Sequence, residues 1–212
     1  MSIGIVGAGN MGRSIATQLA KTGKDVTLTD RNPGKAEAVV LKSPPTASAP
    51  RTYQTRSHRT SSCSRSGIRA RPISPANAAQ LDGKIVVDIS NPLDESWIRL
   101  GIDPSTSSAE RLADQLPASR IVKAFNTTHP PTLAEGQVDA VALDVLLASD
   151  DDAAKSHVSE LVKAAGLRPI DAGQLDNARL LERLTAFQIE LSQRYGLDFR
   201  LSFKLLPAEL PT

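Results

Sequence analysis

Short apolar runs alternate with segments of helical periodicity along this chain of 212 residues. Residues 3–6 form an apolar run that stops at a glycine, as a buried parallel strand does. Apolar residues recur at helical spacing over 10–21, and a second strand-like run follows over 25–30. Strand, glycine turn, helix and strand in this order predict a βαβ unit with a right-handed crossover.

The alternation continues through most of the remaining sequence. A helix is expected over about 32–41, with Asn32 as its cap and Pro33 in its first turn. After residue 76 the expected strands are 84–89, 120–126, 144–148 and 167–171, the expected helices are 107–116, 151–165 and 175–195, and the tail 199–206 is a weak candidate for an edge strand. This order predicts an α/β fold: a Rossmann-type, doubly wound, mainly parallel sheet in a single domain.

Residues 43–75 interrupt the alternation. They contain no Asp or Glu, are dominated by Ser, Arg, Pro and Thr, and show neither a helical nor a strand period. This composition is typical of a disordered segment.

Composition and charge exclude several classes of protein. No apolar run reaches the roughly 18 residues of a membrane span, and the chain enters a strand at once without a basic or apolar leader, so we expect a cytoplasmic protein without a membrane partner. A net charge of +2 makes a nucleic-acid partner unlikely for the chain as a whole. A single cysteine, Cys63, excludes an intramolecular disulfide and a cysteine-based metal cage, and no metal site is expected. The three histidines, His58, His129 and His157, show no partner pattern and are predicted to lie at the surface.

The turn after the first strand carries the chemistry. It is a G-x-G-x-x-G sequence in which Gly7 permits the tight turn, Gly9 lets a pyrophosphate approach the backbone, and Gly12 lets the helix pack closely on the strand. Phosphates would meet the free N–H groups and the positive end of the helix dipole. The predicted pyrophosphate-binding residues are Gly7, Ala8, Gly9, Asn10, Met11 and Gly12.

The end of the second strand bears on the choice between NAD and NADP. Asp30 can accept two hydrogen bonds from an adenosine ribose, which favours NAD and repels a 2′-phosphate. Its neighbour Arg31 can stack on adenine, pair with that phosphate, or be a solvated surface charge. Both residues are predicted to contact the cofactor, and the choice stays open at this point.

Four blocks of sequence together resemble the family of coenzyme F420-dependent NADP oxidoreductases and the related cytoplasmic domains of STEAP metalloreductases. They are IGIVGAGNMGRSIATQLAKTG at 3–23, GKIVVDISNP at 83–92, SAERLADQLPASRIVKAFNTT at 108–128 and GLRPIDAGQLDNARLLERLT at 166–185. The resemblance implies a single Rossmann domain that passes hydride between NADP and a small-molecule electron acceptor or donor, a deazaflavin (coenzyme F420) or a flavin. It favours NADP over NAD through Arg31, whereas Asp30 departs from the small polar residue that the family often has.

The loops after two adjacent strands are expected to flank the nicotinamide, where ligands sit in such sheets. Asn126 can hydrogen-bond the nicotinamide amide or the second ring, or can satisfy only local backbone. Asn91 and Pro92 form either a pocket wall or a plain turn. We assign Asn91, Pro92, Ala124 and Asn126 to the cofactor, and Phe125, Thr127 and Thr128 to the second substrate. Hydride passes directly between two stacked rings, so no catalytic acid or base is assigned.

Measured against this family, residues 43–75 should contain a third strand, a helix and a fourth strand lying beside the first. One hypothesis is translation in the wrong reading frame: back-translation from the third base of Ser57 permits a strand-like Asp-Val-Val-Val-Leu-Ala-Val. The alternative is a genuine basic linker that contacts nucleic acid or a partner. We therefore divide the chain into 1–42, the first part of the NAD(P)-binding domain; 43–75, the anomalous segment; and 76–212, the remainder with its C-terminal helix and tail.

Two rival functions remain open. A β-hydroxyacid dehydrogenase or imine reductase shares the glycine start but normally adds a large helical domain, of which only the helix near 175–195 is visible. A dinucleotide-sensing protein would bind without turnover. A homodimer through the C-terminal helix and tail fits the sequence without an explicit signal for it.

Overall fold

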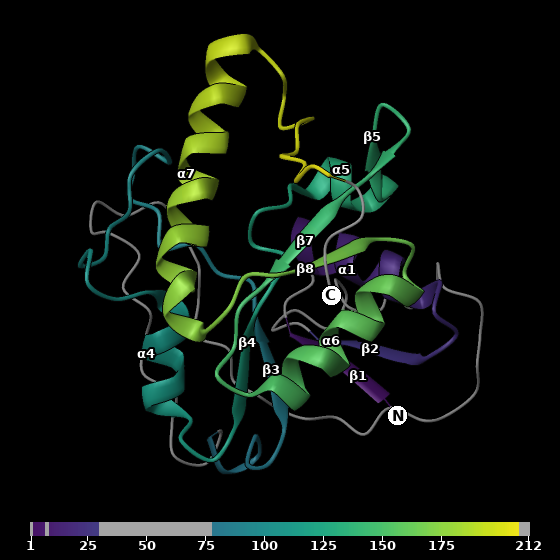
Figure 1. Cartoon of the computed structure of the whole chain (residues 1–212), viewed down its shortest axis with the longest axis vertical. Coiled ribbons are helices and arrows are strands. Elements are labelled where there is room, and N and C mark those ends of the chain that lie inside the picture. The colour runs from purple at the N-terminus through teal and green to yellow at the C-terminus, as the bar shows by residue number, and fades with distance from the viewer. Residues whose placement is uncertain (1, 7–8, 30–77, 208–212) are drawn as a thin grey trace.

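The computed structural model describes residues 2–6, 9–29 and 78–207, and all structural statements concern those ranges (Figure 1). The helix expected over 32–41 and the Arg/Ser/Pro-rich segment 43–75, including Cys63 and His58, lie outside the described residues. The predictions made for them therefore stay predictions.

The N-terminal βαβ unit is confirmed. Strand β1 (Ser2–Val6) pairs in parallel with β2 (Asp25–Thr29), and helix α1 (Asn10–Ala20) connects them. Its buried face carries Ile15, Ala16 and Leu19 at the predicted spacing. The turn after α1 closes at Gly23, whose φ of 68° is open to glycine at little steric cost.

A second parallel pair carries the central loops. Strands β3 (Ile85–Asp88) and β4 (Arg120–Lys123) pair from Ile85 opposite Arg120 to Asp88 opposite Lys123. Helix α4 (Ser108–Gln115) links them, and its cap residue Ser107 accepts a hydrogen bond from the Glu110 amide at 3.1 Å. This is the S-x-x-E start typical of a helix N-terminus.

The third pair is β7 (Asp144–Leu147) with β8 (Arg168–Asp171), again parallel and linked by helix α6 (Asp152–Ala164). An isolated bridge between Lys123 and Ala148 joins β4 to the chain after β7. A 3-10 turn, η1 (Leu175–Asn177), and the long helix α7 (Ala178–Tyr195) follow β8, and the tail over residues 196–207 after them forms neither helix nor strand.

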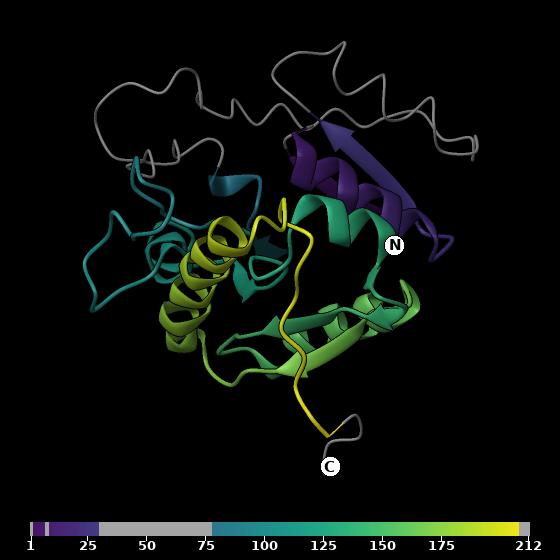
Figure 2. The ribbon, with the colours of Figure 1, turned by 90° about the horizontal axis from the view of Figure 1, so that it is seen from above.

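A small unit between β4 and β7 was not predicted. It consists of helix α5 (Pro130–Glu135) and the short antiparallel strands β5 (Gln137–Val138) and β6 (Val141–Ala142). Figure 2 shows α5 lying along α1. Gln18 of α1 donates to the backbone carbonyls of Leu133 and Ala134 at 2.6 and 2.9 Å, so polar contacts reinforce this packing.

The predicted edge strand in the tail is wrong. Residues 199–206 form no strand, because Asp198 and Phe199 have left-handed backbones with φ of 48° and 61° that break an extended course. Side chains hold the tail instead: Asp144 accepts from the Lys204 ammonium at 2.5 Å and from the Leu205 amide at 2.9 Å.

The fold class is confirmed as α/β with parallel strands. The main core joins α1, β4, β7 and α6, and its fully buried members include Val122, Leu133, Val145, Ala154 and Val162. Within the described ranges, β1 pairs with β2 alone and no ladder connects it to β3. The position beside β1 is the one that the family resemblance assigns to a strand from 43–75. In the same ranges, no helix is long and apolar enough to span a membrane.

Candidate functional site

The start of α1 has the features expected of a phosphate-binding turn. Gly9 is the N-cap with an extended backbone, and no side chain caps the helix within the described residues. A Cβ added at Gly9 would meet no atom of the described residues within 4 Å, so none of them fills the space in front of this glycine. Gly12, one turn on, is buried in the helix packing. The first N–H groups of a helix have no partner within the helix, which leaves them available to an anion.

Of the other residues predicted to hold the dinucleotide, Asn10 and Met11 form the first turn of α1. Gly7, Ala8, Asp30 and Arg31 lie outside the described residues. The choice between NAD and NADP, which depends on Asp30 and Arg31, therefore stays open.

The two loops predicted to flank the nicotinamide do meet. Because β3 and β4 are adjacent and parallel, their carboxyl ends lie at the same edge. The side-chain amide of Asn91 donates to the backbone carbonyl of Asn126 at 3.0 Å. The side-chain amide of Asn126 donates in return to Asn91 Oδ1 at 3.0 Å. Pro92 is buried, and its carbonyl accepts from the Gly101 amide at 2.7 Å.

Asn126 also contacts the long helix. Thr185 Oγ1 lies 2.9 Å from the Asn126 carbonyl and 3.3 Å from its side-chain amide nitrogen. The Asn126 side-chain oxygen, by contrast, is buried without a hydrogen-bond partner in the described part of the chain. A buried acceptor without a partner costs free energy, so a donor N–H that reached this oxygen would be favourable.

The residues assigned to the second substrate are buried in the structure. Phe125 has a left-handed backbone with φ of 60°, which ends the strand, and its side chain belongs to the main core. The Thr128 hydroxyl donates to the Phe125 carbonyl at 2.7 Å and so closes the turn. Thr127 is buried with no partner for its hydroxyl in the described ranges, and Ala124 is fully buried. The contacts of Phe125, Thr127 and Thr128 with a second substrate, and that of Ala124 with the cofactor, stay predictions.

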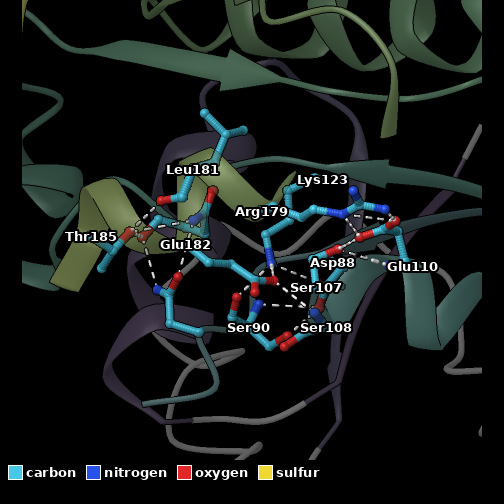
Figure 3. A network of polar contacts seen from close by, with 12 residues as sticks. Asp88, Ser90, Ser107, Ser108, Glu110, Lys123, Arg179, Leu181, Glu182 and Thr185 are labelled. Atoms are coloured by element: carbon cyan, nitrogen blue, oxygen red, sulfur yellow. Dashed lines mark hydrogen bonds and ion pairs between the residues drawn. The ribbon is translucent and has the colours of Figure 1, made fainter. Parts of the chain in front are cut away.

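A buried ion cluster directly beneath these loops was not predicted (Figure 3). The Lys123 ammonium lies 2.7 Å from Asp88 Oδ2 and 2.8 Å from Glu182 Oε1. The side chains of Lys123 and Glu182 are fully buried, and that of Asp88 is 10% exposed. Glu182 Oε1 also accepts from the Ser108 amide at 2.9 Å, which ties α7 to the start of α4. Burial raises the pKa of Glu182 against the opposing effect of Lys123.

The signal for this cluster was present in the sequence. Asp88 and Lys123 each end an apolar strand run, Val-Val-Asp and Ile-Val-Lys, where a charged residue has to be paired if it is buried. Glu182, the second carboxylate that binds Lys123, is 59 residues beyond it, so this pairing could not be read from local spacing.

The surface position predicted for His129 is wrong. It is 4% exposed, its ring packs on Phe199 with centroids 5.6 Å apart, and burial lowers its pKa. His157 is partly buried on α6. Neither belongs to a metal-binding cluster, since no group of three His, Cys, Asp or Glu that could hold a metal occurs among the described residues.

Comparisons with known proteins agree with the geometry of the glycine turn. Residues 2–58 match the family model described as NADP oxidoreductase, coenzyme F420-dependent. Rat metalloreductase STEAP3 is 35% identical over 191 residues, covering 86% of this chain and 36% of that protein. The F420-dependent NADP reductase of Methanocaldococcus jannaschii is 35% identical over 122 residues, covering 55% of this chain and 54% of that protein. The chain thus spans between about a third and about half the length of these relatives.

Solved structures support the fold. A candidate F420-dependent NADP reductase from Arthrobacter sp. FB24 superposes with a TM-score of 0.68 at 23% identity, covering 97% of this chain and 99% of that one. An imine reductase from Bacillus cereus superposes with a TM-score of 0.57 at 16% identity, covering 93% and 63%. At these identities the likeness shows the Rossmann-type fold alone. Over residues 2–58, which contain the glycine turn, the chain is similar to the coenzyme F420-dependent NADP oxidoreductase family.

Proposed function

We propose that this chain binds NADP(H) and transfers hydride between its nicotinamide and a deazaflavin, coenzyme F420, or a flavin. The observation that carries the proposal is the family match over residues 2–58, the range that contains the whole glycine fingerprint. NAD is the alternative dinucleotide, since Asp30 favours it.

The start of α1 fits the pyrophosphate. The open space at Gly9 lets phosphate oxygens reach the first-turn N–H groups, and no acidic residue in the first turn of α1 competes with them. The macrodipole adds favourable charge at this end of the helix.

The loops after β3 and β4 fit the nicotinamide end. The buried Asn126 side-chain oxygen lacks a donor in the described ranges, and a carboxamide N–H supplies one. Asn91 holds Asn126 in place through their reciprocal hydrogen bonds. The bound dinucleotide supplies the hydride, and the side chains of this chain bind it, orient it and exclude water.

A fluorescence titration with NADPH, and separately with NADH, tests the binding step and identifies the preferred nucleotide. Turnover is then followed as NADPH oxidation with coenzyme F420, FMN, FAD, a ferric chelate and a cyclic imine. Turnover with F420 or a flavin supports the proposal, whereas reduction of the imine alone would assign the imine reductase class. Binding without turnover on any acceptor would make the chain a dinucleotide-sensing protein, and no binding would refute the proposal.

We further propose that a second copy of the chain covers the outer face of α7. Leu180, Phe187 and Tyr195 follow one another at helical spacing and are each at least half exposed. Arg183 and Glu190 flank Phe187, so two α7 helices packed antiparallel about a two-fold axis would place opposite charges against each other. Light scattering should give the mass of a dimer, and Phe187→Lys the mass of a monomer. A monomeric unchanged protein at micromolar concentration would refute this interface.

A further inference from the structure

We propose, on the basis of the dinucleotide binding proposed above, that Lys123 is a positioning residue. Together with Asp88 it fixes the Ser90–Asn91 turn against Asn126, so that the wall facing the nicotinamide is already formed before the ligand binds. Figure 3 shows Lys123, Asp88, Ser90 and Glu182 gathered in one buried network.

The Lys123 ammonium uses all of its donors in this network. An ammonium has three N–H groups, and they are directed at Asp88 Oδ2 at 2.7 Å, Glu182 Oε1 at 2.8 Å and the Ser90 carbonyl at 2.5 Å. Because the side chain is fully buried, no water competes for these contacts. The ammonium therefore has one position, and so does the Ser90 carbonyl.

Asp88 holds the other polar groups of Ser90. Its Oδ1 accepts from the Ser90 amide at 3.1 Å and from the Ser90 hydroxyl at 2.7 Å. The amide, hydroxyl and carbonyl of Ser90 are thus all bound by two side chains that lie opposite each other on β3 and β4. The following residue, Asn91, then directs its side chain at Asn126.

Helix α7 secures the same wall from behind. Glu182 binds Lys123, and Thr185, three residues further along the helix, binds Asn126. Both loops that face the proposed nicotinamide site therefore rest on one helix face. One lysine faces two carboxylates here, and Glu182 Oε2 has no partner within the described part of the chain, so the cluster depends strongly on its single cation.

This arrangement predicts an effect confined to the nicotinamide half of the ligand. Without the ammonium, the Ser90 carbonyl loses its donor and the turn is free to shift, which moves Asn91 away from Asn126. The hydrogen bonds of Lys123 go to Asp88, Glu182 and Ser90, and none of them goes to the start of α1, where the pyrophosphate is proposed to bind.

The test compares NADPH with adenosine 2′,5′-bisphosphate, a fragment without nicotinamide, in Lys123→Met and the milder Asp88→Asn. Both variants should weaken NADPH binding about tenfold, the effect of losing one to two hydrogen bonds, and leave the fragment within about twofold. Asp144→Asn is the matched control: it disrupts another buried carboxylate, bound by Arg168 and Lys204, at the start of β7 in a different strand pair. It should change neither affinity. If NADH is the preferred nucleotide, NADH and ADP replace the two probes.

Hydrogen exchange of the free protein gives a readout independent of the ligand. Exchange over residues 88–92 should accelerate in Lys123→Met, or in Asp88→Asn if the former does not fold, but not in Asp144→Asn. Equal weakening of both probes, unchanged NADPH affinity, or unchanged exchange would overturn the positioning role. If the unchanged protein binds neither nucleotide, the proposed function fails, and there is no nicotinamide for Lys123 to position.

Discussion

Replacing Lys123 by methionine should lower the free energy of unfolding by about 3–5 kcal/mol, the cost of removing one partner from a buried ion pair. The substitution keeps an unbranched side chain of similar length, so little volume is lost. What it removes is the ammonium that pairs with both Asp88 and Glu182. Among the described residues, Glu182 is then a fully buried carboxylate left with the Ser108 amide at 2.9 Å, and Asp88 is left with its contacts to Ser90.

Urea unfolding followed by circular dichroism measures this loss. With a slope of about 3 kcal/mol/M, at the upper end of the range for single domains, the midpoint should fall by about 1–2 M. The double variant Lys123→Met/Glu182→Met should be more stable than the single variant, because it removes the carboxylate that the single variant leaves unpaired. The reasoning would be refuted if Lys123→Met lowered the free energy of unfolding by less than about 1 kcal/mol. It would also be refuted if the double variant were no more stable than Lys123→Met.

Three further changes test other parts of the structure. Gly9→Ser should raise the melting temperature slightly, because serine caps α1, yet weaken NADPH binding at least about tenfold, because its side chain fills the space proposed for phosphate; unchanged affinity would contradict the pyrophosphate assignment. Burial alone would raise the pKa of Asp144, but hydrogen bonds from Arg168 and Lys204 lower it. The stability that Asp144 contributes is therefore present above its unfolded pKa and is lost as the pH falls through its folded pKa. In Asp144→Asn, the urea midpoint should depend less on pH across that acid range. Burial lowers the pKa of His129, so the imidazole binds a proton more readily in the unfolded chain than in the folded one. Stability is therefore lost as the pH falls below about 6.5. In His129→Phe, the melting temperature should fall less over that pH range.

The periodicity of apolar residues predicted most helices and strands. It failed where a single backbone angle determines the point at which an element ends. The strand expected over 120–126 ends at Lys123 because the chain turns at Phe125 with a positive φ, which an apolar pattern does not encode. Helix α5 was missed because it has only six residues and starts with two prolines. Its local signal was the pairing of Pro130 at the start with Gly136, φ 80°, at the end.

The candidate site divides in the same way. The contact between Asn91 and Asn126 was foreseeable, because the rule that carboxyl ends of parallel strands meet places both loops at one edge. Glu182 and Thr185 were not foreseeable, since they reach this edge from α7 across 59 residues of sequence. The spacing of residues within a long helix predicts which of them share a face. The position of that helix on the sheet depends on its packing against other elements, which local sequence does not predict.

The two halves of the proposed site are placed relative to each other mainly by helix packing. Gly9 belongs to the β1–β2 pair and Asn91 and Asn126 to the β3–β4 pair, and within the described ranges no ladder joins these pairs. The shared hydrophobic core connects them there, and so does α1 resting on α5, where the Ser14 hydroxyl donates to the Pro130 carbonyl at 2.9 Å and Gln18 binds the end of the same helix. Only Thr127, Thr128 and His129 separate Asn126 from α5, so the packing of α1 on α5 ties the pyrophosphate turn closely to the nicotinamide loops. The titration with NADPH therefore tests whether the packing of the described elements is enough to set the spacing that a dinucleotide spans, or whether a strand beside β1 is required for it.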